Sequence, residues 1–114
     1  MSFFDSEVVR AEMTEISELQ EEVYNNVFKF PQMSKDEKVH HVNMLEKLLN
    51  KQKVLYTRMS LSDDPEAKEM KQRICDSAVM MGMPSNMDMN VMFNNMSTLL
   101  EAMRKQIDKT GTDL

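Results

Sequence analysis

The sequence predicts an all-α fold of four helices, in which a long antiparallel helical hairpin carries a short third and a long fourth helix packed back as a bundle. The 2 glycines and 3 prolines among 114 residues suit long helices, and 6% aromatic residues without tryptophan disfavour a sheet. Apolar residues recur at steps of three and four, as in amphipathic helices. We expect a single helical domain over residues 1–114, with a frayed tail at about 110–114.

The first helix is expected to begin near Ser2 or Asp5 and to end by Phe30, because the residue before Pro31 is pushed out of the helical region. Its apolar stripe consists of Val9, Met13, Ile16, Leu19, Val23 and Val27. The adjacent aromatic residues Phe3–Phe4 are expected to cover the end of the bundle, with a partner contact as the alternative.

The stretch from Ser34 to Met59 gives the longest helical signal. Ser34 and Glu37 have the spacing of a capping box, in which each side chain bonds the backbone amide of the other residue. Steps of three and four then form a heptad-like seam: Val42, Leu45, Leu49, Gln52, Tyr56 and Met59. An isolated helix of this length is marginal in water, so other helices should pack along it.

The two hairpin helices carry opposite charge. Residues 1–30 hold seven acidic and two basic side chains, a balance of −5, and residues 31–61 hold three acidic and six basic ones, a balance of +3. These segments would attract each other as antiparallel neighbours, which their short connection favours. The net charge of −5 for the whole chain makes nucleic acid an unfavourable partner.

The third helix is expected to start at Pro65, with Asp64 as its N-cap, because proline loses nothing at the first helical position. It should run to about Met81 and end at Gly82, which suits the left-handed residue of a helix end, with Pro84 following.

The fourth helix should start after a cap formed by Ser85 and Asp88 and run to about Lys109. Its apolar stripe consists of Met89, Met92, Met96, Leu99, Met103 and Ile107. Basic residues near its end suit the negative pole of the helix dipole.

Several features indicate a cytoplasmic protein without a membrane span. Cys75 is the single cysteine and suits a reducing compartment, as a small buried side chain rather than a nucleophile. The opening residues do not resemble a signal peptide. No apolar run approaches the roughly 20 residues that a membrane-spanning helix needs.

Methionine is the compositional outlier, with 14 residues. On the fourth helix these side chains fit core packing, because a flexible thioether fills irregular gaps. The alternative is a soft surface that holds an apolar partner. The candidate partner-binding residues are Met80, Met81, Met83, Met87, Met89, Met92 and Phe93. A copper(I) site of clustered thioethers is a third interpretation, and its ligands would be Met81, Met83, Met87 and Met89.

No motif in the sequence indicates catalysis. His40 and His41 are adjacent and diverge by about 100° on a helix, so they do not share a metal as residues four apart can. Phosphate-binding glycine loops, nucleophile elbows and zinc-ligand spacings are absent from the sequence. We therefore expect no enzyme, no catalytic residues, no metal site and no cofactor.

Three segments carry a resemblance: FFDSE at Phe3–Glu7, LSDDPEA at Leu61–Ala67, and a Met-Gly turn before a helix with a Met-Phe pair. Together they resemble a small all-helical family of cyanobacteria and their tailed phages that is known only as a domain of unknown function. The resemblance spans Phe3 to about Met103. It implies a cyanobacterial or phage-encoded protein of the host cytoplasm. It suggests no particular activity.

The sequence thus predicts a non-enzymatic interaction module that docks a protein partner of unknown identity through its methionine-rich helical face. A structural or assembly role, as a virion component or its chaperone, is the alternative, and an accessory factor on host RNA polymerase is a third. The two heptad-like seams also make a homodimer plausible.

Overall fold

The computed structural model describes residues 2–80, 82 and 88–110. Within them lie two 3₁₀ segments and four α-helices: η1 (Phe3–Asp5), α1 (Glu7–Asn26), η2 (Val27–Gln32), α2 (Lys35–Leu61), α3 (Pro65–Met80) and α4 (Met89–Thr110). No strand occurs in these ranges, which confirms the all-α fold. The predicted frayed tail lies outside the described residues beyond Thr110.

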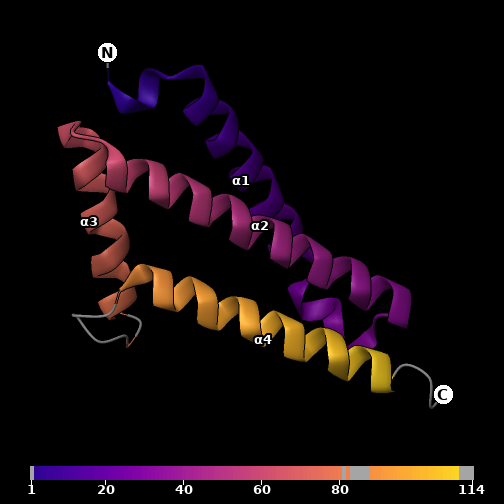
Figure 1. The fold of residues 1–114 in the computed structure, drawn as a ribbon. Coiled ribbons are helices and arrows are strands. Elements are labelled where there is room, and N and C mark those ends of the chain that lie inside the picture. Colours follow the sequence, from indigo (N-terminus) through magenta and orange to yellow (C-terminus); the bar gives the residue numbers. More distant parts are fainter. Residues whose placement is uncertain (1, 81, 83–87, 111–114) are drawn as a thin grey trace.

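The long helix α2 is the centre of the fold. It lies between α1 and α4 and runs antiparallel to both, while α3 crosses from the end of α2 to the start of α4 (Figure 1). The overall dimensions are 55 × 32 × 19 Å. The smallest of these is close to two helix diameters. We call the row formed by α1, α2 and α4 the helical layer; α3 packs across one end of it.

The helix boundaries follow the predicted caps. In the capping box of α2, the Glu37 amide donates to Ser34 Oγ at 3.2 Å, and the Ser34 amide donates to the Glu37 carboxylate at 3.4 Å. Asp64 accepts from the Glu66 amide at 2.9 Å at the start of α3. After α3, Gly82 has a φ of 101°, the positive value that glycine adopts without steric cost.

The fourth helix begins as expected on its aspartate. Asp88 Oδ1 accepts from the Asn90 amide at 2.9 Å, and the Asp88 carbonyl accepts from the Val91 amide at 3.0 Å. Ser85, the other predicted cap residue, lies outside the described residues.

The segment expected to form one first helix is divided into three pieces. Ser2 and Asp5 close a capping box around η1, and Ser6 then adopts extended backbone before α1 starts. At the other end, α1 stops at Asn26 and the chain continues as η2 through Pro31. The tighter 3₁₀ turn suits this short connector, because proline cannot supply the backbone amide that an α-helix uses.

Complementary charge joins the hairpin helices, as the uneven distribution predicts. The ion pairs link Glu12 to Arg58, Glu15 to Lys51 and Glu22 to His40. The first has an N–O distance of 2.9 Å, and the third, at 3.9 Å, is an ion pair only when the histidine is protonated. Exposed pairs of this kind contribute about 0.2–1 kcal/mol each. They therefore help to determine how α1 pairs with α2, but they add little to the stability of the fold.

The apolar core consists of two clusters on different sides of α2. The α1–α2 cluster contains Ile16, Leu19, Val23 and Leu48. The α2–α3–α4 cluster contains Leu49, Tyr56, Met59, Ala67, Met89 and Phe93. Leu55 packs against both clusters, and the hydrophobic core therefore follows α2 rather than filling the space between four parallel helices.

The N-terminal segment is attached to the start of α3. The Phe3 amide donates to Asp64, the Ser2 hydroxyl donates to the Glu66 carboxylate, and the Phe3 ring packs against the α2–α3–α4 cluster. Hydrogen bonds from the amides of Glu66 and Phe3 hold the pKa of Asp64 below its ordinary value. The FFDSE and LSDDPEA motifs are thus two halves of one junction.

Candidate functional site

The predicted methionine-rich surface is not one continuous surface. Met89 and Phe93 are each only 5% exposed in the α2–α3–α4 cluster, and Met92 packs partly buried against it. This corrects the expectation that Met89 and Phe93 face a partner, since Phe93 stacks edge to face on Tyr56 at 5.8 Å between centroids. Met80 is 89% exposed. Met81, Met83 and Met87, and with them most of the copper(I) candidate, lie outside the described residues.

A different apolar surface lies over α2, between α1 and α4. On α2, Leu45 and Gln52 occupy helical positions between Leu48, which packs on α1, and Leu49, which packs with α4. Both are only partly covered. We name this surface the α2 groove; it comprises Met13 and Gln20 of α1, Leu45 and Gln52 of α2, and Met92, Met96, Leu99 and Met103 of α4.

The walls of the α2 groove are apolar and accessible. Met13 is 38% exposed, Met96 42% and Leu99 64%. Met96 and Leu99 belong to the apolar stripe of α4, but that stripe is wider than the strip that α2 covers. Met96 and Leu99 therefore remain accessible on the side of the stripe that α2 does not cover.

The ion pairs that join α2 to α1 and α4 lie on the opposite side of α2 from Leu45 and Gln52, by helical position. Arg104 of α4 donates to Asn43 at 2.7 Å and to Glu46 at 2.6 Å on α2, and the α1–α2 ion pairs lie on the same side of α2 by helical position. None of the residues that define the α2 groove is charged. The α2 groove therefore lies on a different side of α2 from these ion pairs.

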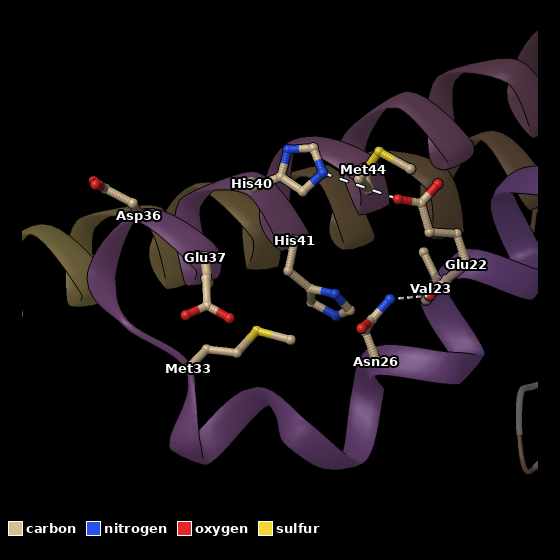
Figure 2. A pocket seen from close by; sticks show the side chains of 9 residues that line it. All are labelled: Glu22, Val23, Asn26, Met33, Asp36, Glu37, His40, His41 and Met44. Atoms are coloured by element: carbon tan, nitrogen blue, oxygen red, sulfur yellow. Dashed lines mark hydrogen bonds and ion pairs between the residues drawn. The ribbon is translucent and has the colours of Figure 1, made fainter.

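A pocket of about 370 Å³ lies at the closed end of the α1–α2 hairpin. Figure 2 shows its side chains, which come from α1, the connection and the first turns of α2. They are Glu22, Val23, Asn26, Met33, Asp36, Glu37, His40, His41 and Met44. The carboxylates of Glu22 and Glu37 face the pocket, whereas that of Asp36 points away from the other side chains (Figure 2). Methionine and valine side chains supply apolar walls.

His41 is the buried polar residue of this pocket. It is 6% exposed, and its ring lies 5.4 Å from the Phe30 ring and points among the pocket residues (Figure 2). Within the described part of the chain, its ring nitrogens make no hydrogen bond or ion pair. Burial, and then the neighbouring His40, hold the pKa of His41 below its ordinary value, so the ring is neutral at pH 7.

This burial should make stability depend on pH. Above the ordinary pKa of 6.5, folded and unfolded chains both hold a neutral ring, and His41 adds no pH dependence. As the pH falls through 6.5 toward the lowered folded pKa, the unfolded chain takes up a proton that the folded chain resists, so the free energy of unfolding falls. In urea denaturation, His41→Phe should remove this part of the slope, and exposed His40→Gln should retain it. An unchanged slope in His41→Phe would contradict the burial.

The pocket does not have the geometry of a metal site. Among the described residues, no three His, Cys, Asp or Glu side chains come close enough together to hold a metal ion. His40 contacts Glu22 on the α1 side, whereas the His41 ring points in another direction, among the pocket side chains (Figure 2). The two rings diverge as the sequence predicts.

Cys75 lies at the boundary of the α2–α3–α4 cluster, partly buried as a small side chain. Its Sγ lies 3.7 Å from the Tyr56 hydroxyl. Burial and this contact raise the pKa of Tyr56 to about 12, so the phenol stays protonated. The pair is a packing contact of the core.

Three further observations come from the sequence and its comparison with known proteins. None of the helices in the described ranges is long and apolar enough to cross a membrane. The model of a protein family described as "Domain of unknown function (DUF1825)" matches residues 1–107. No curated protein and no solved structure matches the chain.

Proposed function

Because the chain belongs to the DUF1825 family of unknown function, whose description names no activity, we propose from its geometry that it is a non-enzymatic interaction module. In this proposal, the α2 groove docks one amphipathic helix of a protein partner. The observation that carries it is the exposure of Met96 and Leu99 in the uncharged α2 groove. Soft, adaptable methionine side chains suit such docking.

The dimensions of the fold favour a helix as the occupant. α1 and α4 lie on either side of α2 (Figure 1), and packed helices lie about 8–10 Å apart. A helix lying over Leu45 and Gln52 would contact α1 on one side and α4 on the other. Its apolar face would cover the exposed side chains of the α2 groove.

The absence of charge in the α2 groove limits the kind of partner. Docked helices contribute apolar residues at steps of three, four and seven, and a charge placed over Leu45 would lose water without gaining an ion pair. The partner helix should therefore present an uncharged apolar stripe. Following the family resemblance, we expect this partner in a cyanobacterial or phage-infected cell.

A pair of matched double variants tests the proposal. Met96→Glu with Leu99→Glu adds two charges to the α2 groove, whereas Asn94→Glu with Thr98→Glu adds the same charges to the outward side of α4. Both variants should keep their helical circular dichroism, because all four positions are exposed. With a photo-crosslinking residue at Gln20, mass spectrometry should identify one partner segment of helical periodicity, lost at least about tenfold in the groove variant alone.

Other outcomes would replace the proposal. Crosslinks to a second copy, with a mass of twice 13.3 kDa in light scattering, would show that the groove is a homodimer interface. Recovery of the protein in purified phage particles would favour the structural role. Equal labelling in both double variants would show that the α2 groove binds no partner helix.

A further inference from the structure

We propose that the pocket at the closed end of the α1–α2 hairpin binds a small organic cation: a linear alkyl diamine or polyamine. The ammonium groups would bind the carboxylates at the opening, His41 would accept a hydrogen bond inside, and the alkyl chain would lie along the methionine walls. This site is separate from the α2 groove and does not depend on the proposed function.

The charge of the pocket favours a cation. Glu22 comes from α1, and Asp36 and Glu37 come from the first turn of α2. One carboxylate oxygen of Glu37 accepts a hydrogen bond from the backbone amide of Ser34, and the other oxygen remains available as an acceptor. His40, which lines the pocket, approaches Glu22 at 3.9 Å, a weak contact that depends on protonation. The Lys38 ammonium lies over the Phe30 ring, 5.6 Å from its centroid. An anionic ligand would meet the carboxylates of Glu22 and Glu37 in this pocket, with Asp36 nearby.

His41 supplies the second and independent observation. A nearly buried polar side chain ordinarily has a hydrogen-bond partner, and His41 is only 6% exposed, although its ring nitrogens are not sealed from solvent. Its ring instead points into a pocket of about 370 Å³ with no protein partner among the described residues. A neutral imidazole nitrogen can accept a hydrogen bond from an ammonium group.

The arrangement of the acceptors selects an extended organic cation over a metal ion. The histidines and carboxylates do not converge within metal-binding distance, and a divalent ion needs several ligands at about 2.0–2.6 Å. Separated charges along a flexible chain can instead meet separated carboxylates. Met33, Met44 and Val23 cover the space between them and suit the methylene groups. The volume lies within the range of about 300–1,000 Å³ for small-molecule pockets.

Two matched comparisons test this site on the full chain. The probe is 1,6-diaminohexane, and its neutral counterpart is 1,6-hexanediol. With methyl-labelled methionine, the diamine should shift the NMR signals of Met33 and Met44 saturably, and the diol should not. Glu22→Gln should weaken diamine binding by about threefold, the effect of one partly exposed ion pair. Glu21→Gln removes the same charge from the neighbouring residue outside the pocket and should weaken it less.

A further variant separates the buried acceptor from the general charge. His41→Phe keeps an aromatic ring beside Phe30 and should retain helical circular dichroism while weakening diamine binding. The proposal is overturned if Met33 and Met44 do not shift, if the diol shifts them equally, or if Glu21→Gln and Glu22→Gln weaken binding equally. Zn²⁺ shifting the same signals at lower concentration than the diamine would also overturn it. Diamine binding should persist in the Met96→Glu, Leu99→Glu variant, so failure of one proposal leaves the other intact.

Discussion

Replacing Phe93 with alanine is expected to lower the free energy of unfolding by about 3–5 kcal/mol, as for other buried phenylalanines. The ring is 5% exposed, stacks on Tyr56 and belongs to the cluster that joins α2, α3 and α4. Its removal leaves a cavity that these helices can only partly close. Urea denaturation followed by circular dichroism measures the change, with an unaltered m-value as the sign that the folded and unfolded states are otherwise the same.

Leu99→Ala is the matched control on the same helix. Leu99 is 64% exposed, and truncating a surface side chain usually changes stability by less than about 0.5 kcal/mol. The two variants together determine the rotation of α4 about its axis. A small loss in Phe93→Ala with a large loss in Leu99→Ala would mean that α4 turns its predicted stripe, and not Phe93, toward α2.

The rotation of α4 is the part of the fold that its sequence leaves open. Periodicity locates the centre of the apolar stripe near Met96 and Met103, but α2 covers one edge of that stripe. Which edge is covered depends on Tyr56 and Leu49, far away in the sequence, and on the position that α3 gives to the start of α4. Local propensity contains no information about this choice, so the sequence leaves Phe93 as a candidate partner-binding residue, whereas its ring lies in the core.

Helix ends were predictable because their causes are local. Ser34 and Glu37 form the capping box of α2, three residues apart. Asp64 caps α3 by accepting from the amide of Glu66, two residues away. Gly82 has the positive φ that a residue with a Cβ rarely adopts. In each case the residues responsible lie within four positions of one another, so the sequence pattern alone predicts where the helix begins or ends.

The pocket could not be predicted in the same way. His41 is buried because η2 brings Phe30 and Met33 back over the first turns of α2, and that depends on a 3₁₀ path through Pro31. The sequence offers one signal only, the adjacent histidines, whose rings diverge as their helical spacing predicts (Figure 2). Glu22 reaches the same opening from α1. The charge pattern predicts that α1 and α2 pair, but it does not specify which residues of the two helices lie opposite each other.

Ala67→Leu is expected to destabilise the protein by about 1–3 kcal/mol through overpacking. Ala67 has 0% exposure in the α2–α3–α4 cluster, and the added carbons have no space unless α3 moves away from α2. Ala102→Leu makes the same change at an exposed position of α4 and should leave stability within about 0.5 kcal/mol. Urea denaturation of the two variants side by side gives the difference.

The same variant also tests the junction between the N-terminal segment and α3. Ala67 lies three residues after Asp64, which accepts from the Phe3 amide, and Phe3 packs on the same cluster. Displacing α3 should therefore expose the Phe3 amide to faster hydrogen exchange, while the Glu37 amide at the far end of α2 keeps its protection. Loss of stability with unchanged exchange at Phe3 would mean that η1 moves with α3 as one unit. Faster exchange would show that the FFDSE and LSDDPEA motifs hold together only while α3 packs closely on α2.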